Sequence, residues 1–191
     1  MIMANDKWPA VDEAWQIVRW HTQNERLLLH ARAVGLLMAA FAKKFGEDEA
    51  KWEAAGILHD FDYEQNPTPE THVWAGMKIL REMGMDEALL TLIASHADYT
   101  HTPRDTPAAK VLYAVDELSG FLIACALIKP SKKLADVDVQ SVKKRMKEKG
   151  FARAVDRDAI IKGAEALGVP LDEHIQFCLN SLLPHAGELK V

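Results

Sequence analysis

The sequence lacks the short motifs that mark several large enzyme classes. It contains no GxxxxGK[ST] phosphate loop, no GxSxG nucleophile elbow, no HExxH zinc motif, and no GxGxxG run after a strand-like segment. Each of these motifs depends on a defined backbone geometry, so their absence argues against P-loop enzymes, α/β-hydrolases, zincins and dinucleotide-binding folds. Clusters of β-branched residues with alternating spacing are missing too, which argues against β-strands.

Cysteine, excess positive charge and long apolar runs are also scarce. Cys125 and Cys178 lie far apart in apolar stretches without a CxxC partner, and we expect both to be reduced core residues. The formal net charge of −5 gives no overall attraction to nucleic acid or to an anionic membrane, so neither partner is expected. Residues 1–15 lack the basic start and apolar core of a signal peptide, and no segment is apolar enough to span a membrane. A cytoplasmic protein is expected.

Apolar residues recur at helical spacing along the chain, which predicts an all-α helical bundle. The length and a hydrophobic fraction of 49% favour a single domain. Thr68 followed by Pro69 is typical of a helix start, Asp86 can cap another helix, and Gly46 is suited to a helix end. The helices expected run over about 24–45, up to the doublet at 59–60, and over about 69–83, 86–97, 107–128, 156–167 and 171–183.

Residues 131–153 differ from the rest of the chain because they are basic and polar. Such a run either binds a polyanion or forms a solvated helix face, and the solvated face is the commoner case. We expect it to open a C-terminal helical extension over residues 131–191, next to a core over about residues 24–128.

Histidines are concentrated in the first half of the chain, and six of the eight precede residue 102. Asp116 interrupts the apolar run AKVLYAVDELSGFLIACAL, where a carboxylate is costly to bury unless it is paired or bound to a cation. Imidazole and carboxylate together suit first-row transition metals, and helices in a bundle can project such ligands to one point. The six histidines are His21, His30, His59, His72, His96 and His101.

The doublet His59–Asp60 stands where the apolar run AAGIL gives way to the acidic, aromatic DFDYE. Adjacent residues in a helix point about 100° apart, so the two side chains cannot share a face in mid-helix. At a helix end they can converge. The doublet therefore favours a shared metal, with the second oxygen of Asp60 available to bridge to another.

The ordered set His30, His59–Asp60 and Asp116 resembles the H…HD…D signature of the HD-domain superfamily, all-helical metal-dependent phosphohydrolases. The likeness extends over about residues 24–128, and His72 and His96 resemble the additional histidines of HD subfamilies with two metals. Downstream, residues 114–134 and 141–157 also resemble a group of small bacterial HD proteins. The resemblance implies an HD-domain helical bundle with additional C-terminal helices.

The resemblance also implies a ligand set. One divalent metal would be held by His30, His59, Asp60 and Asp116, and a second by Asp60, His72 and His96. Iron, manganese, cobalt, nickel and zinc all accept such ligands, so the metal and the number per chain, one or two, stay open. Asp60 would be the catalytic bridge between the two metals.

The sequence departs from a common HD variant, in which Ile-Gly and then a lysine follow the doublet (the HDIG pattern). Here the chain reads HDFDYEQ, without a nearby lysine. Arg104 is the best replacement as a phosphate-binding catalytic group, and Lys110 is a weaker one, although either can equally be a solvated charge. The sequence allows three roles for His101: a third metal ligand, a substrate contact or a surface residue.

The function implied is hydrolysis of a phosphate ester or anhydride, in a nucleotide or another small phosphorylated metabolite, by a metal-activated hydroxide. One alternative is a di-iron HD oxygenase. Another is a non-catalytic HD module that senses a nucleotide, against which the complete ligand set argues. The tryptophans near the N-terminus make a homodimer plausible.

Overall fold

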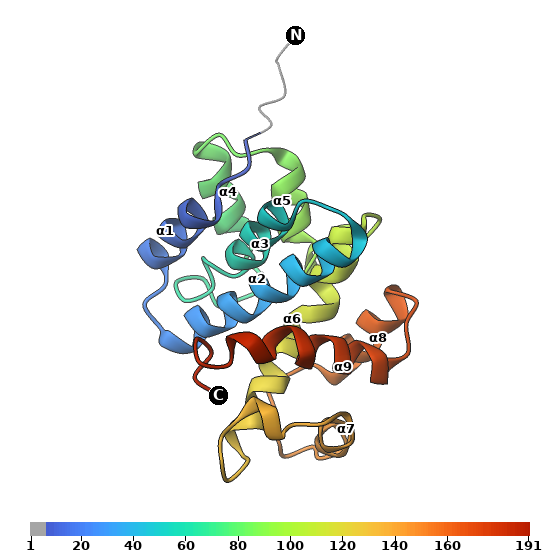
Figure 1. Cartoon of the computed structure of the whole chain (residues 1–191). Helices are drawn as coiled ribbons and strands as arrows, with labels where there is room; N and C mark the ends of the chain where they lie inside the picture. The colour runs from blue at the N-terminus through green and yellow to red at the C-terminus, as the bar shows by residue number, and fades with distance from the viewer. Residues whose placement is uncertain (1–6) are drawn as a thin grey trace. The chain divides into compact units, whose positions relative to one another are not determined.

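The computed structural model describes residues 7–191, and every regular element in that range is a helix, without a β-strand (Figure 1). This confirms the all-α prediction. The first six residues, part of the stretch from which a signal peptide was excluded, lie outside the described residues. Among the helices described, none is both long and apolar enough to cross a membrane.

The chain divides into two compact units, Met1–Leu112 and Tyr113–Val191. The boundary falls inside the long helix α6 (Pro107–Leu127), whereas the sequence placed the change of character after residue 128. The two units are described one at a time. The assignment of all 191 residues to a single domain stays a prediction.

The first unit contains five helices before α6, and side chains cap three of them. Asn24, Asp48 and Asp86 each accept a hydrogen bond from a backbone N–H in the first turn of the helix that follows. Gly46, in the left-handed conformation, ends the second helix as predicted. The elements are α1 (Val11–His21), α2 (Glu25–Phe45), α3 (Glu49–Leu58), α4 (Trp74–Glu82), α5 (Glu87–Ala94) and the 3₁₀ turn η1 (Asp98–Thr100).

Helices α2 and α3 pack closely against each other, and α1 lies against α3 (Figure 1). A Cβ atom on Gly56 would lie 2.9 Å from the Cα of Gly35, so glycine is required where the two backbones meet. The same two helices bring the imidazoles of His30 and His59 together, with 3.2 Å between their Nε2 atoms. The close helix contact therefore sets the distance between two of the predicted metal ligands.

Two predicted helix boundaries in this unit are wrong. The helix expected from residue 69 begins at Trp74, because Thr68 starts a turn whose carbonyl accepts from the N–H groups of Thr71 and His72. The helix expected to reach residue 97 ends at Ala94. His72 and His96 therefore lie in the turns that flank these helices and not within the helices. In a turn, the backbone is not held to helical geometry, so it can direct these side chains toward Asp60.

The second unit contains the rest of α6 and three further helices. Helix α9 contacts both α7 and α8. His174 is buried and its Nε2 donates to the carbonyl of Ala114, while Cys125 and Cys178 are free and buried as predicted. The elements are η2 (Leu134–Asp136), α7 (Val139–Met146), α8 (Arg157–Ala166), α9 (Leu171–Leu182) and η3 (Leu183–His185).

Candidate metal centre

The doublet lies at the end of α3, as the sequence predicted. His59 is the C-cap residue and is fully buried, and Asp60 begins the turn that leaves the helix. The Nε2 of His59 lies 3.5 Å from Oδ2 of Asp60, so the two adjacent side chains do converge. The side chain of Asp60 is 20% exposed, so part of it is accessible to solvent.

Four imidazoles surround the carboxylate of Asp60. Its Oδ1 lies 3.0 Å from Nε2 of His72 and 3.2 Å from Nε2 of His96. Its Oδ2 lies 3.5 Å from Nε2 of His59 and 3.9 Å from Nε2 of His30. Each oxygen thus faces its own pair of histidines. This is the arrangement required of a carboxylate that bridges two metal positions.

Backbone carbonyls fix the orientation of two of these rings. The Nδ1 of His59 donates to the carbonyl of Gly56 at 2.7 Å, and the Nδ1 of His96 donates to the carbonyl of Ile93 at 2.6 Å. Because a carbonyl can only accept, the proton of each neutral ring sits on Nδ1. The lone pair is then on Nε2, the atom that faces Asp60, which is the tautomer that binds a metal.

Asp62 orients the ring of His72 by accepting a hydrogen bond from its Nδ1. Its Oδ1 accepts from Nδ1 of His72 at 3.0 Å, and its Oδ2 accepts from the backbone N–H of Gly76 at 3.0 Å. Asp62 is buried, and a Cβ atom on Gly76 would lie 3.0 Å from its carboxylate carbon. The sequence marks Asp62 as part of a departure from the HD variant, and its positioning role was not predicted. Its signal was a carboxylate next to two apolar aromatic positions.

The backbone between His72 and α4 is strained. Val73 has φ 68° and ψ −49°, a combination that β-branched residues rarely adopt, and its side chain is buried. Such a conformation costs about 1 to 3 kcal/mol and persists only where the surroundings enforce it. Here it ends the turn that carries His72 and starts the helix that carries Gly76. The strain therefore sits between the imidazole and the residue that anchors its carboxylate partner.

The charges of the centre shift two pKa values in opposite directions. Burial alone would raise the pKa of Asp60, but the charge of His59 and the hydrogen bonds of His72 and His96 hold it well below its usual range. Burial alone would lower the pKa of His72, but Asp60 and Asp62 outweigh it and raise this pKa to about 9. In the metal-free protein at neutral pH, His72 is therefore a cation that donates to both carboxylates.

These groups fit a divalent transition metal. Asp60, His72 and His96 each offer a ligand atom, and these atoms all lie within 4.8 Å of one another. Nitrogen and oxygen donors of this kind suit iron, manganese, cobalt, nickel and zinc. The Nδ1 partners at Gly56, Ile93 and Asp62 provide the outer support that such ligands usually have.

Asp116, the last member of the predicted set, lies on the part of α6 that belongs to the second unit. It is half-buried, and its carbonyl accepts from the hydroxyl of Ser119. Its role as a ligand stays a prediction from the HD pattern.

Arg104 is engaged with the turn that follows α5. Its Nε donates to the carbonyl of Ser95 at 2.6 Å, one Nη2 contact reaches the carbonyl of His96 at 3.3 Å, and the same nitrogen pairs with Asp98 at 2.7 Å. These contacts hold the backbone of His96 in place. A phosphate contact of Arg104 stays a prediction, and the observed contacts describe a positioning residue.

The remaining candidates are less closely tied to the centre. His101 is exposed and ends η1 with φ 54°, and Lys110 is half-buried on α6. Glu64, the other acidic residue after the doublet, accepts from the backbone N–H groups of Gln23 and Asn24 at the start of α2. Asp62 and Glu64 are the two acidic residues found where the variant has a lysine. Asp62 therefore orients a histidine of the centre, whereas Glu64 stabilises the start of α2.

Comparison with protein families matches residues 27–120 to the family described as HD domain. No solved structure was found that matches the chain. The matched range contains every residue of the predicted ligand set, the fold is all-α, and five of the six ligands surround one carboxylate or form part of it. Residues 27–120 match the HD-domain family, whose members are mostly metal-dependent phosphohydrolases.

Proposed function

We propose that this protein is a metal-dependent phosphohydrolase that cleaves a phosphate ester or anhydride in a nucleotide or another small phosphorylated metabolite. One observation carries the proposal: each carboxylate oxygen of Asp60 faces a separate pair of imidazoles. The HD-domain match supplies the reaction class.

In this proposal Asp60 is shared by two metal positions. His72 and His96 complete one, and His30 and His59 complete the other, to which the HD pattern adds Asp116. Divalent metals held in this way lower the pKa of a bound water toward neutrality and neutralise phosphate oxygens.

The chain's own residues keep this geometry fixed. The carbonyls of Gly56 and Ile93 and the carboxylate of Asp62 hold three Nδ1 protons, so the three Nε2 atoms face Asp60 without reorganisation. Arg104 fixes the turn of His96 through the Ser95 and His96 carbonyls. The buried positions of His59, His72 and His96 limit water to the open side of the centre.

The test is release of inorganic phosphate by the full chain from a panel of nucleotides and small phosphate esters, assayed with each of the five metals. We expect turnover of at least one compound, and loss of that turnover in Asp60→Ala. His185→Ala is the matched control, because His185 is a histidine of the second unit whose side chain pairs with Glu188.

Three results would overturn the proposal. Tight binding of a nucleotide without turnover would indicate a sensor module. Consumption of oxygen by the iron-loaded protein with an oxidisable substrate would indicate an oxygenase. Full activity in Asp60→Ala would place the reaction elsewhere in the chain.

A further inference from the structure

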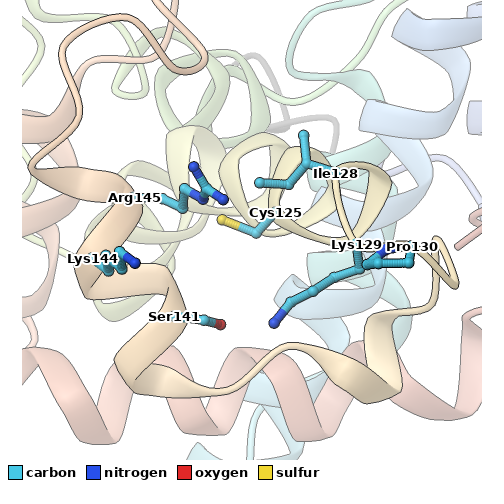
Figure 2. Close-up of a pocket in the computed structure, with 7 residues that line it drawn as sticks. All are labelled: Cys125, Ile128, Lys129, Pro130, Ser141, Lys144 and Arg145. Carbon is cyan, nitrogen blue, oxygen red and sulfur yellow. The ribbon is translucent and has the colours of Figure 1, made fainter.

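The second unit contains a pocket of about 260 Å³ between the end of α6 and α7. Figure 2 shows the side chains around it, with the ammonium of Lys129 reaching across the opening toward the α7 side. The lining has an apolar part, Cys125, Ile128 and Pro130, and a cationic part, Lys129, Lys144 and Arg145.

The pocket gathers positive charge without matching negative charge. No carboxylate is among its lining residues, and within residues 7–191 neither Lys129 nor Lys144 forms an ion pair. Arg145 does pair with Glu148, and its guanidinium lies 5.6 Å from the ring centre of Phe151. These contacts hold the arginine in place, whereas the two lysines have no ion-pair partner in the described part of the chain.

The lining charges affect the pKa of the Cys125 thiol inside the pocket. Burial raises the pKa of its thiol to about 11; the positive charges of Arg145 and Lys129 act to lower it, and the negative charge of Glu148 acts to raise it. The thiol is therefore neutral and adds an apolar surface, not a nucleophile. The hydroxyl of Ser141, also in the lining, accepts from the Asp138 N–H in the capping box of α7 and donates to the Asp138 carbonyl. Only the cationic side chains of the lining, Lys129, Lys144 and Arg145, are then available to bind an anion.

The pocket cations differ from their neighbours in the same basic segment. Lys143 pairs with Asp172, and Lys147 and Lys149 lie outside the lining. A merely solvated helix face would not concentrate cations around a hollow in a chain whose net charge is −5. The volume is slightly below the roughly 300 to 1,000 Å³ of typical ligand pockets, which favours a small ligand.

We propose that this pocket is a binding site for a small phosphate-bearing anion with more than one negative charge. Lys129, Lys144 and Arg145 would hold the phosphate oxygens, and Cys125, Ile128 and Pro130 would contact any apolar part. The site belongs to the second unit and does not depend on the activity proposed for the metal centre.

The test is calorimetric titration of the full chain with pyrophosphate, performed on the Asp60→Asn variant so that binding at the metal centre does not contribute. We expect saturable binding that Lys129→Ala combined with Lys144→Ala weakens by about tenfold or more, the loss of two charge-assisted contacts. The matched control combines Lys147→Ala with Lys149→Ala. It makes the same change of charge outside the pocket and should weaken binding less than about twofold, since charges that do not contact the anion act only through screened solvent.

A second measurement keeps the test independent of how the variants fold. In the unaltered chain, pyrophosphate should shift the backbone amide resonances of residues 125–145. Equal weakening by both lysine pairs would show diffuse attraction and overturn the proposal. So would the absence of binding, or binding that is lost in Asp60→Asn and kept in the pocket variant, which would place the anion at the metal centre.

Discussion

The two candidate sites of this chain are organised in different ways. In the first unit, the groups around Asp60 are largely buried, and a second hydrogen bond orients each of the imidazoles of His59, His72 and His96. In the second unit, the pocket cations stand on flexible stems, and only Arg145 has a charged partner. Metal ligands must be held rigidly, whereas flexible charged side chains can adjust to bind an anion. The comparison predicts that changes at the centre act through geometry and changes at the pocket act through charge.

Asp60→Asn gives the largest expected effect. The amide keeps the size of the side chain but removes the charge and one acceptor oxygen, so the side chain can no longer serve both metal positions. We expect loss of both metals and a fall in activity of about a thousandfold or more. Elemental analysis and phosphate release measure the two effects, and retention of either would break the account of Asp60 as the bridge.

Asp62→Asn tests whether orientation alone matters. The variant keeps the shape of the residue that contacts His72 and Gly76 but removes the charge, and metal affinity should fall by about 10 to 100-fold. Glu64→Gln is the matched control, because Glu64 binds the backbone of Gln23 and Asn24 and no imidazole. Equal loss of metal affinity in both variants would show that general acidity near the doublet, and not the hydrogen bond to His72, sets the affinity.

The raised pKa of His72 predicts a pH dependence. A metal must displace the proton from Nε2, so metal affinity should rise by up to about tenfold per pH unit between pH 6.5 and about 9. The folding stability of the metal-free protein should change in the opposite direction, falling as pH rises. Its folded pKa is raised above the ordinary 6.5, so the stabilisation from His72 is complete below pH 6.5 and is lost as pH rises through about 9.

The size of that stability change is at most about 3 kcal/mol. Thermal unfolding of the metal-free and metal-loaded chain between pH 6 and 10 measures it. His72→Gln removes the titrating group and should flatten both profiles, and a wild-type profile that is already flat would contradict the assigned pairing with Asp60 and Asp62.

Gly76→Ala gives the smallest effect. The added methyl group would meet the Asp62 carboxylate at about 3.0 Å, so the carboxylate must shift by a few tenths of an ångström. We expect metal affinity to fall several-fold and stability to change by about 1 to 2 kcal/mol, the usual range for overpacking. Gly150→Ala is the control, because nothing lies near a Cβ atom at that position.

Much of this arrangement was predictable from local sequence signals. The helix over residues 25–45, the long helix opened by Thr106 and Pro107, and the convergence of His59 and Asp60 at a helix end all follow from capping and periodicity. These features depend on residues close in sequence, and the HD pattern supplied the ligand set.

The unpredicted features depend on tertiary contacts. Pro69 suggested a helix start, yet the turn from Thr68 and the strained Val73 delay the helix so that His72 can reach Asp60. The positioning role of Asp62 depends on its contact with Gly76, and the contacts of Arg104 depend on where α5 ends. Helix propensity cannot foresee a backbone conformation that only the surrounding structure enforces.

The most direct test of the central claim is the metal content per chain, by elemental analysis of full-length protein purified without chelator, with His72→Ala and His96→Ala beside it. The account predicts two metals in the wild type and about one in each variant, because His72 and His96 face Oδ1 of Asp60 and leave the Oδ2 side intact. A single metal per chain, unchanged in both variants, would contradict a carboxylate shared between two metal positions.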